Sequence, residues 1–397
     1  MFSIKRYRSE DRSVWDNFVK EARNATFLFM RDYMDYHADR FTDCSWMVWK
    51  GSRLVALLPA NLTPDGTLHS HQGLTYGGWI LPFGHINTTD LLEIFHEAIA
   101  VWREMGITAL DYKPLPSIYC ATPSDDAEYA LFRLGATLTE ANVSSSLPLA
   151  ASLPEASSLS LASSSLPEAS SLSTAASLPE ASSLSLASSS LPEATSLSHA
   201  ASLQRENCQI PHSESSCLRD CGANAVSAPS HYNKLRKRAL AKASRLDFRI
   251  RETDSAAELL TLVADCLRDR HNAAPVHTAA ELQRLKACFS EQIRFWLLDY
   301  DGAPQAAVCI YDTGRVAHAQ YIASTPLARD LNLLTPLFHH LISNVYADRC
   351  YFDFGTSNED HGRYLNDGLL RQKTSYGATA LLHRRYHLPL SAAAVTM

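Results

Sequence analysis

The sequence predicts an α/β protein with mixed sheets, arranged as two lobes on either side of a disordered insert. Three observations support this prediction. The chain has 397 residues, whereas single hydrophobic cores stop growing at roughly 250–300 residues, so more than one core is expected. Strand-like and amphipathic helix-like segments alternate on both sides of the middle of the chain, as α/β architecture requires. The middle itself is a Ser/Leu/Ala-rich repeat.

The repeat has a period of 25 residues: 150–174 reads AASLPEASSLSLASSSLPEASSLST, and 175–199 differs from it at two positions. Proline recurs in LPEA after 12 or 13 residues and interrupts any helix, and no aromatic residue occurs. Such a segment cannot bury enough apolar surface to offset the entropy of ordering it. We therefore expect a disordered linker over 144–228, an N-terminal lobe over 1–143, and a C-terminal lobe over 229–390 followed by a short tail, 391–397.

The elements of the first lobe follow from periodicity and turn residues. Helical spacing of apolar residues predicts helices at 13–23 and 90–105. Alternation around Lys50-Gly51-Ser52 predicts a hairpin of strands 45–49 and 54–61, and an apolar run predicts a buried strand at 108–113.

The second lobe reads in the same way. We expect helices at 232–244, 256–270, 331–347 and 364–376. The strands are expected at 295–299, 306–312, 316–324, 351–355 and 380–386, the first two joined over Asp301-Gly302.

Composition indicates a soluble cytoplasmic protein without a metal. The nine cysteines are scattered and odd in number, as in reduced proteins, and neither a signal peptide nor an apolar run of membrane-spanning length is present. Cys208, His212, Cys217 and Cys221 lack the paired C-x2-C spacing of common zinc sites. Phosphate-loop, dinucleotide, His-Glu-x-x-His and Gly-x-Ser-x-Gly motifs are also missing, which argues against kinases, dehydrogenases, zinc proteases and α/β-hydrolases.

The net charge of −6 conceals an asymmetry. After residue 228 there are 21 Lys and Arg against 17 Asp and Glu, a surplus of four basic groups. This would suit an anionic ligand such as a CoA or nucleotide phosphate, and ordinary surface variation explains it equally well.

Two clusters combine polar side chains with glycine at strand ends, where open α/β sheets bind ligands. They are residues 69–78 (HSHQGLTYGG) and 351–360 (YFDFGTSNED). In the first, strand alternation places His69 and His71 on one face, and a polar hairpin is the alternative. In the second, a buried strand leads into a polar turn whose alternative role is to cap a helix. Strand 316–324 presents His318, Gln320 and Ser324 on one face.

The second half, with RHNAAPVHT, AHAQYIAS, YFDFGTSNED and LNDGLLRQKTSYGA, resembles the GNAT acyltransferases of Fem and BioF2-like type. The first half, with FLFMRDYMDYHADRF and HSHQGLTYGG, is similar to the partner lobe of those proteins. The resemblance implies two GNAT-like lobes and an enzyme that transfers an acyl group, acetyl above all, from acyl-CoA to an amine. It also implies that strand 316–324 splays from strand 351–355, so that the gap admits the pantetheine of the donor.

One departure from the usual GNAT sequence leaves the identity of the acyl donor undecided. GNAT enzymes usually follow the splayed strand with a glycine-containing loop around the CoA pyrophosphate, whereas this chain has Ser324-Thr325-Pro326-Leu327-Ala328-Arg329-Asp330. Arg329 could pair with a phosphate instead, although Pro326 lacks a donor N–H. Two alternatives follow: a Fem-type peptidyltransferase that uses aminoacyl-tRNA, with the basic helix 234–242 facing the RNA, and a catalytically degenerate GNAT-like binding module.

The resemblance assigns roles to particular positions. The catalytic candidates are His318, Asp353, Ser357, Asn358 and Glu359, with His318 and Glu359 as equal candidates for the general base. The donor is expected to contact Gln320, Tyr321, Ile322, Ala323, Arg329 and Asn366. The acceptor, an amine of a small molecule or of a cell-surface glycan or peptidoglycan precursor, is expected to contact Arg40, His69, His71, Gln72, Tyr76, His271 and Lys373.

Overall fold

The computed structural model describes residues 1–149, 229–271 and 273–390. The expected linker from residue 150 to 228, the four candidate zinc ligands within it and the expected tail lie outside these residues. The described residues belong to one compact unit.

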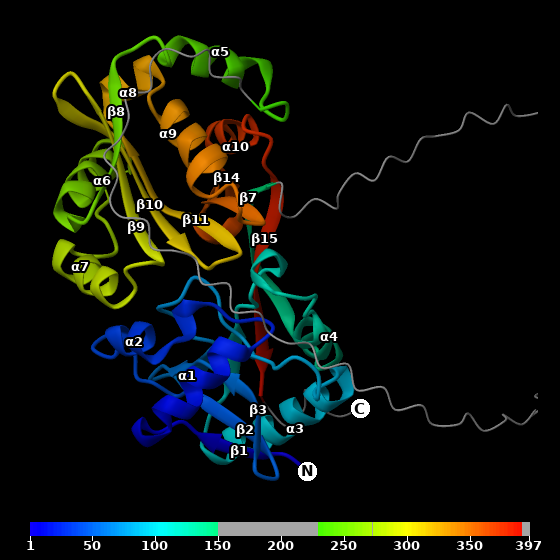
Figure 1. Cartoon of the computed structure of the whole chain (residues 1–397). Helices are drawn as coiled ribbons and strands as arrows, with labels where there is room; N and C mark the ends of the chain where they lie inside the picture. The colour runs from blue at the N-terminus through cyan, green and yellow to red at the C-terminus, as the bar shows by residue number, and fades with distance from the viewer. Residues whose placement is uncertain (150–228, 272, 391–397) are drawn as a thin grey trace, which may run out of the picture. The chain divides into compact units, whose positions relative to one another are not determined.

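One large mixed sheet runs through both lobes (Figure 1). Its strand order is β4-β5-β6-β15-β7-β12-β11-β10-β9-β8. A three-stranded sheet, β1-β2-β3, packs in the first lobe, and β13 and β14 form a small hairpin in the second. The bounds are β1 (Ser3–Arg6), β2 (Trp46–Lys50), β3 (Arg53–Leu58), β4 (Asn61–Leu62), β5 (Thr67–His69), β6 (Ala109–Tyr112), β7 (Thr137–Pro148), β8 (Phe248–Thr253), β9 (Ile293–Tyr300), β10 (Ala303–Asp312), β11 (Val316–Ser324), β12 (Tyr351–Thr356), β13 (Asn358–Glu359), β14 (Tyr364–Leu365) and β15 (Thr379–Pro389).

Helices cover both faces of the second-lobe strands. The alternation along β9 sends Leu297 towards α6 and α7 and Leu298 towards α5 and α9, so each face has its own apolar core. The helices are α1 (Arg12–Glu21), α2 (Arg31–Met34), α3 (Thr88–Glu104), α4 (Asp126–Arg133), α5 (Lys234–Ala243), α6 (Ala256–His271), α7 (Ala279–Cys288), α8 (Pro326–Leu331), α9 (Leu334–His340) and α10 (Asp367–Thr374). Short 3-10 turns, among them Ser117–Tyr119, connect several of the helices and strands.

The helix expected over 331–347 differs from the structure at its ends. Asn332 adopts the left-handed conformation (φ 60°) and ends α8, and α9 then continues into a π-helical turn, Leu341–Val345. A left-handed residue cannot continue an α-helix, and asparagine tolerates that conformation better than most residues. The predicted helix was therefore wrong only at its ends: it begins at Leu334 rather than 331, and its helical residues continue to Val345.

The two long strands β7 and β15 join the lobes. β15 pairs with β7 along most of its length and with β6 at its end, so that Leu388 and Leu390 enter the apolar core of the first lobe. In the opposite direction, Leu147 near the end of β7 and Leu149 just after it enter the core of the second lobe. Figure 1 shows β15, in red, passing from the second lobe into the first. Each lobe is thus completed by a strand from the other half of the chain, and β7 extends five residues beyond the boundary expected at 143.

Parallel strands β11 and β12 separate after a short stretch of pairing. Only Val316, Ala317 and His318 pair with β12, opposite Tyr351, Phe352 and Asp353. Beyond Asp353, β12 shifts register and pairs with β7 through Thr356 and Ser144, while β11 stays with β10 up to Ser324. The splay that the resemblance implied between these two strands is therefore present.

Candidate active site

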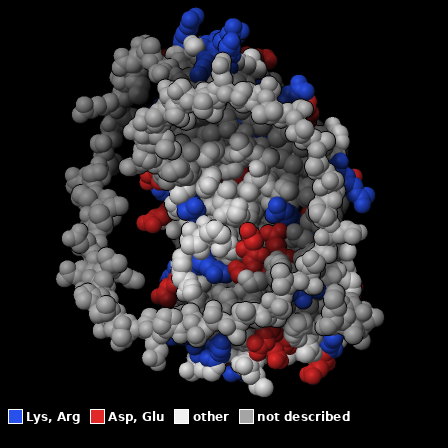
Figure 2. Space-filling model, turned by 90° about the vertical axis from the view of Figure 1, so that its right-hand side faces the viewer, with Lys and Arg blue, Asp and Glu red and all other residues white. Residues whose placement is uncertain are grey.

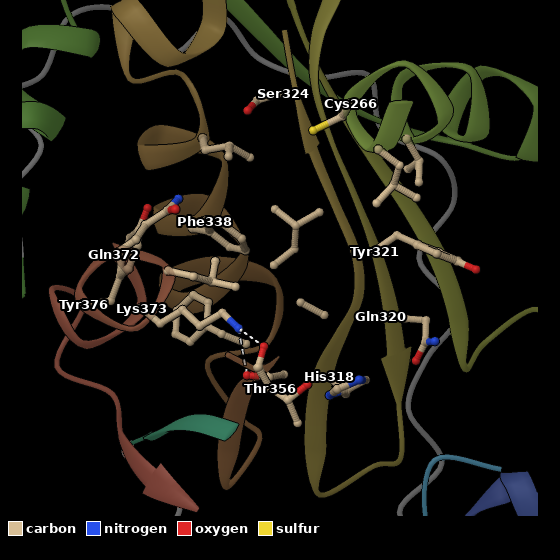
Figure 3. A pocket seen from close by; sticks show the side chains of 18 of the residues that line it. Cys266, His318, Gln320, Tyr321, Ser324, Phe338, Thr356, Gln372, Lys373 and Tyr376 are labelled. Atoms are coloured by element: carbon tan, nitrogen blue, oxygen red, sulfur yellow. Dashed lines mark hydrogen bonds between the residues drawn. The ribbon is translucent and has the colours of Figure 1, made fainter. Parts of the chain in front are cut away.

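A cavity of about 760 Å³ opens where β11 and β12 separate. Residues of β11 form one wall, and residues of α9 and α10 form the wall opposite (Figure 3). Much of the lining is apolar, with Val263, Ile322, Phe338 and Phe354 among the residues that contribute. A mostly apolar cavity with a few polar groups is the usual form of a small-molecule site.

His318 lies at the base of the splay and lines the cavity. Its Nδ1 is 2.9 Å from Oδ2 of Asp353, the residue opposite it in the strand pairing. Because an ionised carboxylate only accepts hydrogen bonds, Nδ1 carries the proton and donates it to Asp353. The neutral ring then has Nε2 as its acceptor, and no hydrogen-bond partner of Nε2 occurs in the described part of the chain. This arrangement is the one that a general base requires.

Asp353 is fully buried and accepts hydrogen bonds from four groups. Besides His318, the donors are Tyr119 Oη (2.7 Å) to Oδ2, and Ser144 Oγ (2.6 Å) and the Gly355 amide (3.2 Å) to Oδ1. Burial alone raises the pKa of Asp353, but the hydrogen bonds that it accepts, first that of His318 and then that of Ser144, hold it well below its usual range. The carboxylate therefore stays ionised and fixes the orientation of His318.

Two of these hydrogen-bond donors, Tyr119 and Ser144, were not identified as site residues from the sequence. Tyr119 lies in a 3-10 turn of the first lobe, and its ring packs against that of Tyr76 with centroids 4.8 Å apart. Ser144 lies on β7, inside the serine-rich stretch that composition assigned to the linker. The first half of the chain thus contributes directly to the groups that orient His318.

Lys373 reaches the same end of the cavity from α10. Its Nζ donates to the carbonyl oxygens of Gly355 (2.8 Å) and Thr356 (2.6 Å), as the dashed lines in Figure 3 show. Burial lowers the pKa of Lys373 to about 8, against the opposing effect of the Asp353 charge. Since an ammonium group has three N–H donors, one remains for a ligand.

The residues expected to contact the donor divide into two groups. Gln320, Tyr321, Ile322 and Arg329 line the cavity. Ala323, in contrast, points into the core formed with α6 and is 1% exposed, because adjacent residues of a strand face opposite sides.

Asn366 does not face the cavity either. Its side chain accepts from the Leu369 amide as the N-cap of α10 and donates to Glu359.

The polar turn after β12 is structural in this arrangement. The Ser357 amide donates to the Val143 carbonyl, and the Val143 amide donates to the Asn358 side chain, which ties the turn to β7. Glu359 is exposed and receives its hydrogen bond from Asn366. Ser357, Asn358 and Glu359 are not among the described residues that line the cavity. Of the two candidates for the base, only His318 faces it.

The acceptor candidates of the first lobe lie outside the described lining of the cavity. His69 pairs with Asp111 (3.3 Å), and Gln72 bonds to Asn61 (2.9 Å). Arg40 lies 3.6 Å from Glu281 of the second lobe.

Two further acceptor candidates of the first lobe, His71 and Tyr76, also lie outside that lining. His71 is buried and adopts a positive φ of 66°. Tyr76 donates to Thr26 (3.3 Å) and lies behind Tyr119, whereas its neighbour Thr75 does line the cavity. His271 is the last residue of α6. The expected strand alternation of His69 and His71 was wrong, because β5 ends at His69 and His71 lies beyond it with a left-handed backbone.

Among the described residues, no group of three or more His, Cys, Asp or Glu side chains is arranged to hold a metal ion. Within the same ranges, no helix has the length and apolar character needed to cross a membrane.

Residues 230–363 match the family model described as "Acetyltransferase (GNAT) domain". The second lobe, with its splayed β11 and β12, therefore has the fold of a GNAT domain. No curated protein matches the chain in sequence.

Among solved structures, FemX shares 9% identity, with 98% of this chain and 97% of that chain covered and a TM-score of 0.59. A conserved protein of unknown function from Bacteroides thetaiotaomicron shares 10% identity, covers 98% and 100% of the two chains and has a TM-score of 0.50. At this identity the likeness establishes the fold alone: the described residues share the two-lobed fold of FemX.

Proposed function

We propose that this protein is an N-acyltransferase that moves an acyl group, acetyl above all, from acyl-CoA to an amine, with His318 as the general base. The observation that carries the proposal is the bond from His318 Nδ1 to buried Asp353, which leaves Nε2 as an acceptor at the splay. A base in that position can take the proton of an amine held beside a thioester in the cavity.

The reaction follows from these groups. The amine nitrogen attacks the thioester carbonyl carbon, and His318 Nε2 takes the proton that the nitrogen loses. The oxygen of the tetrahedral intermediate is negative, and the remaining N–H of Lys373, at the same end of the cavity, stabilises it. The intermediate collapses, the C–S bond breaks, and the proton passes from His318 to the departing thiolate of CoA.

The acceptor belongs to the side of the cavity that faces the first lobe. Thr75 of that lobe lines the cavity, and Tyr119 bonds to Asp353, so an acceptor at His318 would contact both lobes. We propose the amine of a cell-surface glycan or peptidoglycan precursor, made in the cytoplasm where the acyl donor is available.

A Fem-type transfer from aminoacyl-tRNA is the second candidate. The observation in its favour is the outer face of α5, where Lys234, Arg238 and Lys242 are exposed. Figure 2 shows Lys and Arg side chains gathered at the top of the molecule, over α5. Binding of charged tRNA that weakens steeply with salt would support this candidate, since phosphate contacts depend on ionic strength.

The test uses purified protein, a panel of acyl-CoA donors and a panel of amines, with release of free thiol as the readout. We expect thiol release that His318→Gln abolishes and that Glu359→Gln, the matched control for the rejected base, leaves within twofold. Equal loss in both variants would refute the assignment of the base. No thiol release with any pair, together with binding of neither CoA nor tRNA, would favour a catalytically degenerate binding module.

A further inference from the structure

Arg236 is a buried arginine that points from α5 into the cavity. It is 9% exposed. Its Nε donates to Ser375 Oγ (2.9 Å), its Nη1 to Thr335 Oγ1 (2.6 Å), and its Nη2, at 3.5 Å, to the Gln372 carbonyl. All three acceptors are neutral, and the guanidinium carbon lies 4.2 Å from the centroid of the Tyr376 ring. No carboxylate pairs with Arg236 in the part of the chain that the structure describes.

The charge of the cavity is one-sided. Arg236, Arg329 and Lys373 all line it, while no Asp or Glu does so among the described residues. Arg329 donates to the Ser324 carbonyl (2.7 Å), and Lys373 donates to two carbonyls, so neither is neutralised there. Asp353 lies behind the wall, where its oxygens already accept from four donors.

Such an arrangement is unfavourable without a ligand. Removing a guanidinium from water costs free energy that neutral hydroxyl and carbonyl partners offset only in part, whereas an anion offsets it well. Three of the five N–H groups of Arg236 have the partners named above, and the bond of Nη2 is long. Donors therefore remain for a second, charged partner.

We propose that Arg236 binds a phosphate group of the acyl donor, and that Arg329 adds positive charge to the same cavity. Arginine presents a planar fork that suits two phosphate oxygens. The site supplies by a side chain what the segment from Ser324 to Asp330, which has no glycine, does not supply by its backbone. The identification of the ligand as the donor rests on the proposed function, whereas the anion site does not.

Binding is measured by calorimetry on the full chain with CoA, inorganic pyrophosphate and pantetheine. We expect Arg236→Gln to weaken CoA and pyrophosphate binding at least tenfold and to leave pantetheine, which has no phosphate, unchanged. The matched control is Arg245→Gln, which removes an exposed arginine just after α5 and should leave all three affinities as in the wild type. Equal CoA affinity in Arg236→Gln and wild type, or no binding of any phosphate probe to wild type, would overturn the inference.

The melting temperature without ligand distinguishes a ligand-binding role of Arg236 from a purely structural one. If Arg236 has no charged partner without ligand, relief of the buried charge offsets the loss of its three hydrogen bonds. The ligand-free melting temperature of Arg236→Gln should then stay near that of wild type, and only the upward shift caused by CoA should be lost. A large drop without ligand would instead show that Arg236 holds α5 to α9 and α10. Should Arg236→Gln fail to fold, Arg236→Lys keeps the charge but loses the planar guanidinium, and we expect it to bind CoA with intermediate affinity. Wild-type CoA affinity in Arg236→Lys would refute phosphate binding by two N–H groups of the guanidinium.

The outcomes separate this inference from the proposed function. CoA binding that depends on Arg236, without thiol release, would refute the acyltransferase and retain the anion site. Thiol release with the same KM for acyl-CoA in wild type and Arg236→Gln would retain the acyltransferase and refute the assignment of Arg236 to the donor phosphate. If charged tRNA binds in an Arg236-dependent way and CoA does not, the phosphate is that of the RNA terminus and the anion site again stands.

Discussion

Replacing Asp353 with asparagine changes a single atom of the site and tests how His318 is oriented. In the native protein, His318 Nδ1 and Tyr119 Oη converge on Oδ2, while Ser144 Oγ and the Gly355 amide converge on Oδ1. The new NH2 group must face one of these pairs. It cannot face the Gly355 amide, which only donates. Oδ2 therefore becomes the nitrogen, and His318 and Tyr119 must turn from donors into acceptors.

The consequences for catalysis and stability follow from that switch. Once Nδ1 accepts, the neutral ring of His318 carries its proton on Nε2 and can no longer take one from an amine. A loss of general-base catalysis corresponds to roughly 10²–10⁴-fold in rate. Hydrogen bonds to a charged acceptor are worth about 1 kcal/mol more than neutral ones. Four such bonds to Asp353 place an upper limit of about 4 kcal/mol on the stability lost, and relief of the buried charge offsets part of it.

The tautomer can be read without knowledge of the substrate, from the 15N chemical shifts of the His318 ring. We expect the Nδ1–H form in wild type and the Nε2–H form in Asp353→Asn, together with the loss of thiol release. Ser144→Ala is the matched control: it removes one donor from the other oxygen, should cost about 1–3 kcal/mol of stability, and should leave the tautomer unchanged. The same tautomer in wild type and Asp353→Asn, or unimpaired turnover in the variant, would refute this account.

Three further predictions concern the first lobe. Tyr119→Phe removes a 2.7 Å hydrogen bond to a buried carboxylate and should lower the free energy of unfolding by about 1–3 kcal/mol, with less than tenfold loss of turnover; unchanged urea unfolding would contradict it. Burial, together with neighbouring positive groups, lowers the pKa of His37 to about 4 and of His71 to about 3. Between pH 6.5 and about 4 the unfolded chain binds more protons, so stability should fall with falling pH, by about 2–3 kcal/mol for each histidine at pH 4.5; urea midpoints that do not change over this range would exclude it. Gly78→Ala places a Cβ 2.4 Å from a buried tyrosine hydroxyl at φ +88°, and should cost more than about 2 kcal/mol, whereas Gly106→Ala, at φ +79° with open space around it, should cost about 1 kcal/mol; equal melting temperatures of the two variants would contradict the steric argument.

Regular periodicity made most of the second lobe predictable. The strand expected at 316–324 matches β11 at both ends, and the helix expected at 256–270 differs from α6 by one residue. These segments carry an unbroken apolar pattern that serves one secondary structure only. β8, a short edge strand with four charged or polar residues, and α7, whose apolar stripe is narrow, carried too little of that pattern and were missed.

Composition misjudged β7 for a definite reason. Ser144, Ser145 and Ser146 are buried in the middle of the sheet, where small residues allow close packing, but in the sequence they continue smoothly into the serine-rich repeat. A residue type that is common in linkers is thus also suited to a crowded interior strand. Only the pairing of β7 with β12 and β15 distinguishes the two roles.

The candidate site divides along similar lines. His318 and Asp353 were both identified because they lie on strands that the sequence marks clearly, yet nothing local states that their register places them opposite each other. Tyr119 had no signal at all, since it is one aromatic residue in an irregular turn 199 residues before His318. Arg236 was recognised only as part of a basic helix, and its burial depends on α9 and α10 packing against that helix.

By itself, the sequence determined the class of fold, most elements of the second lobe and the strands that carry His318 and Asp353, because these depend on local apolar patterns and on motifs that are continuous in the chain. The tertiary structure decided which of the two candidate bases faces the cavity, which side chains of the first lobe reach Asp353, and where the buried guanidinium of Arg236 lies. Those properties depend on strand register, on the crossing of β7 and β15 between the lobes and on burial, all of which arise from contacts between residues far apart in the sequence.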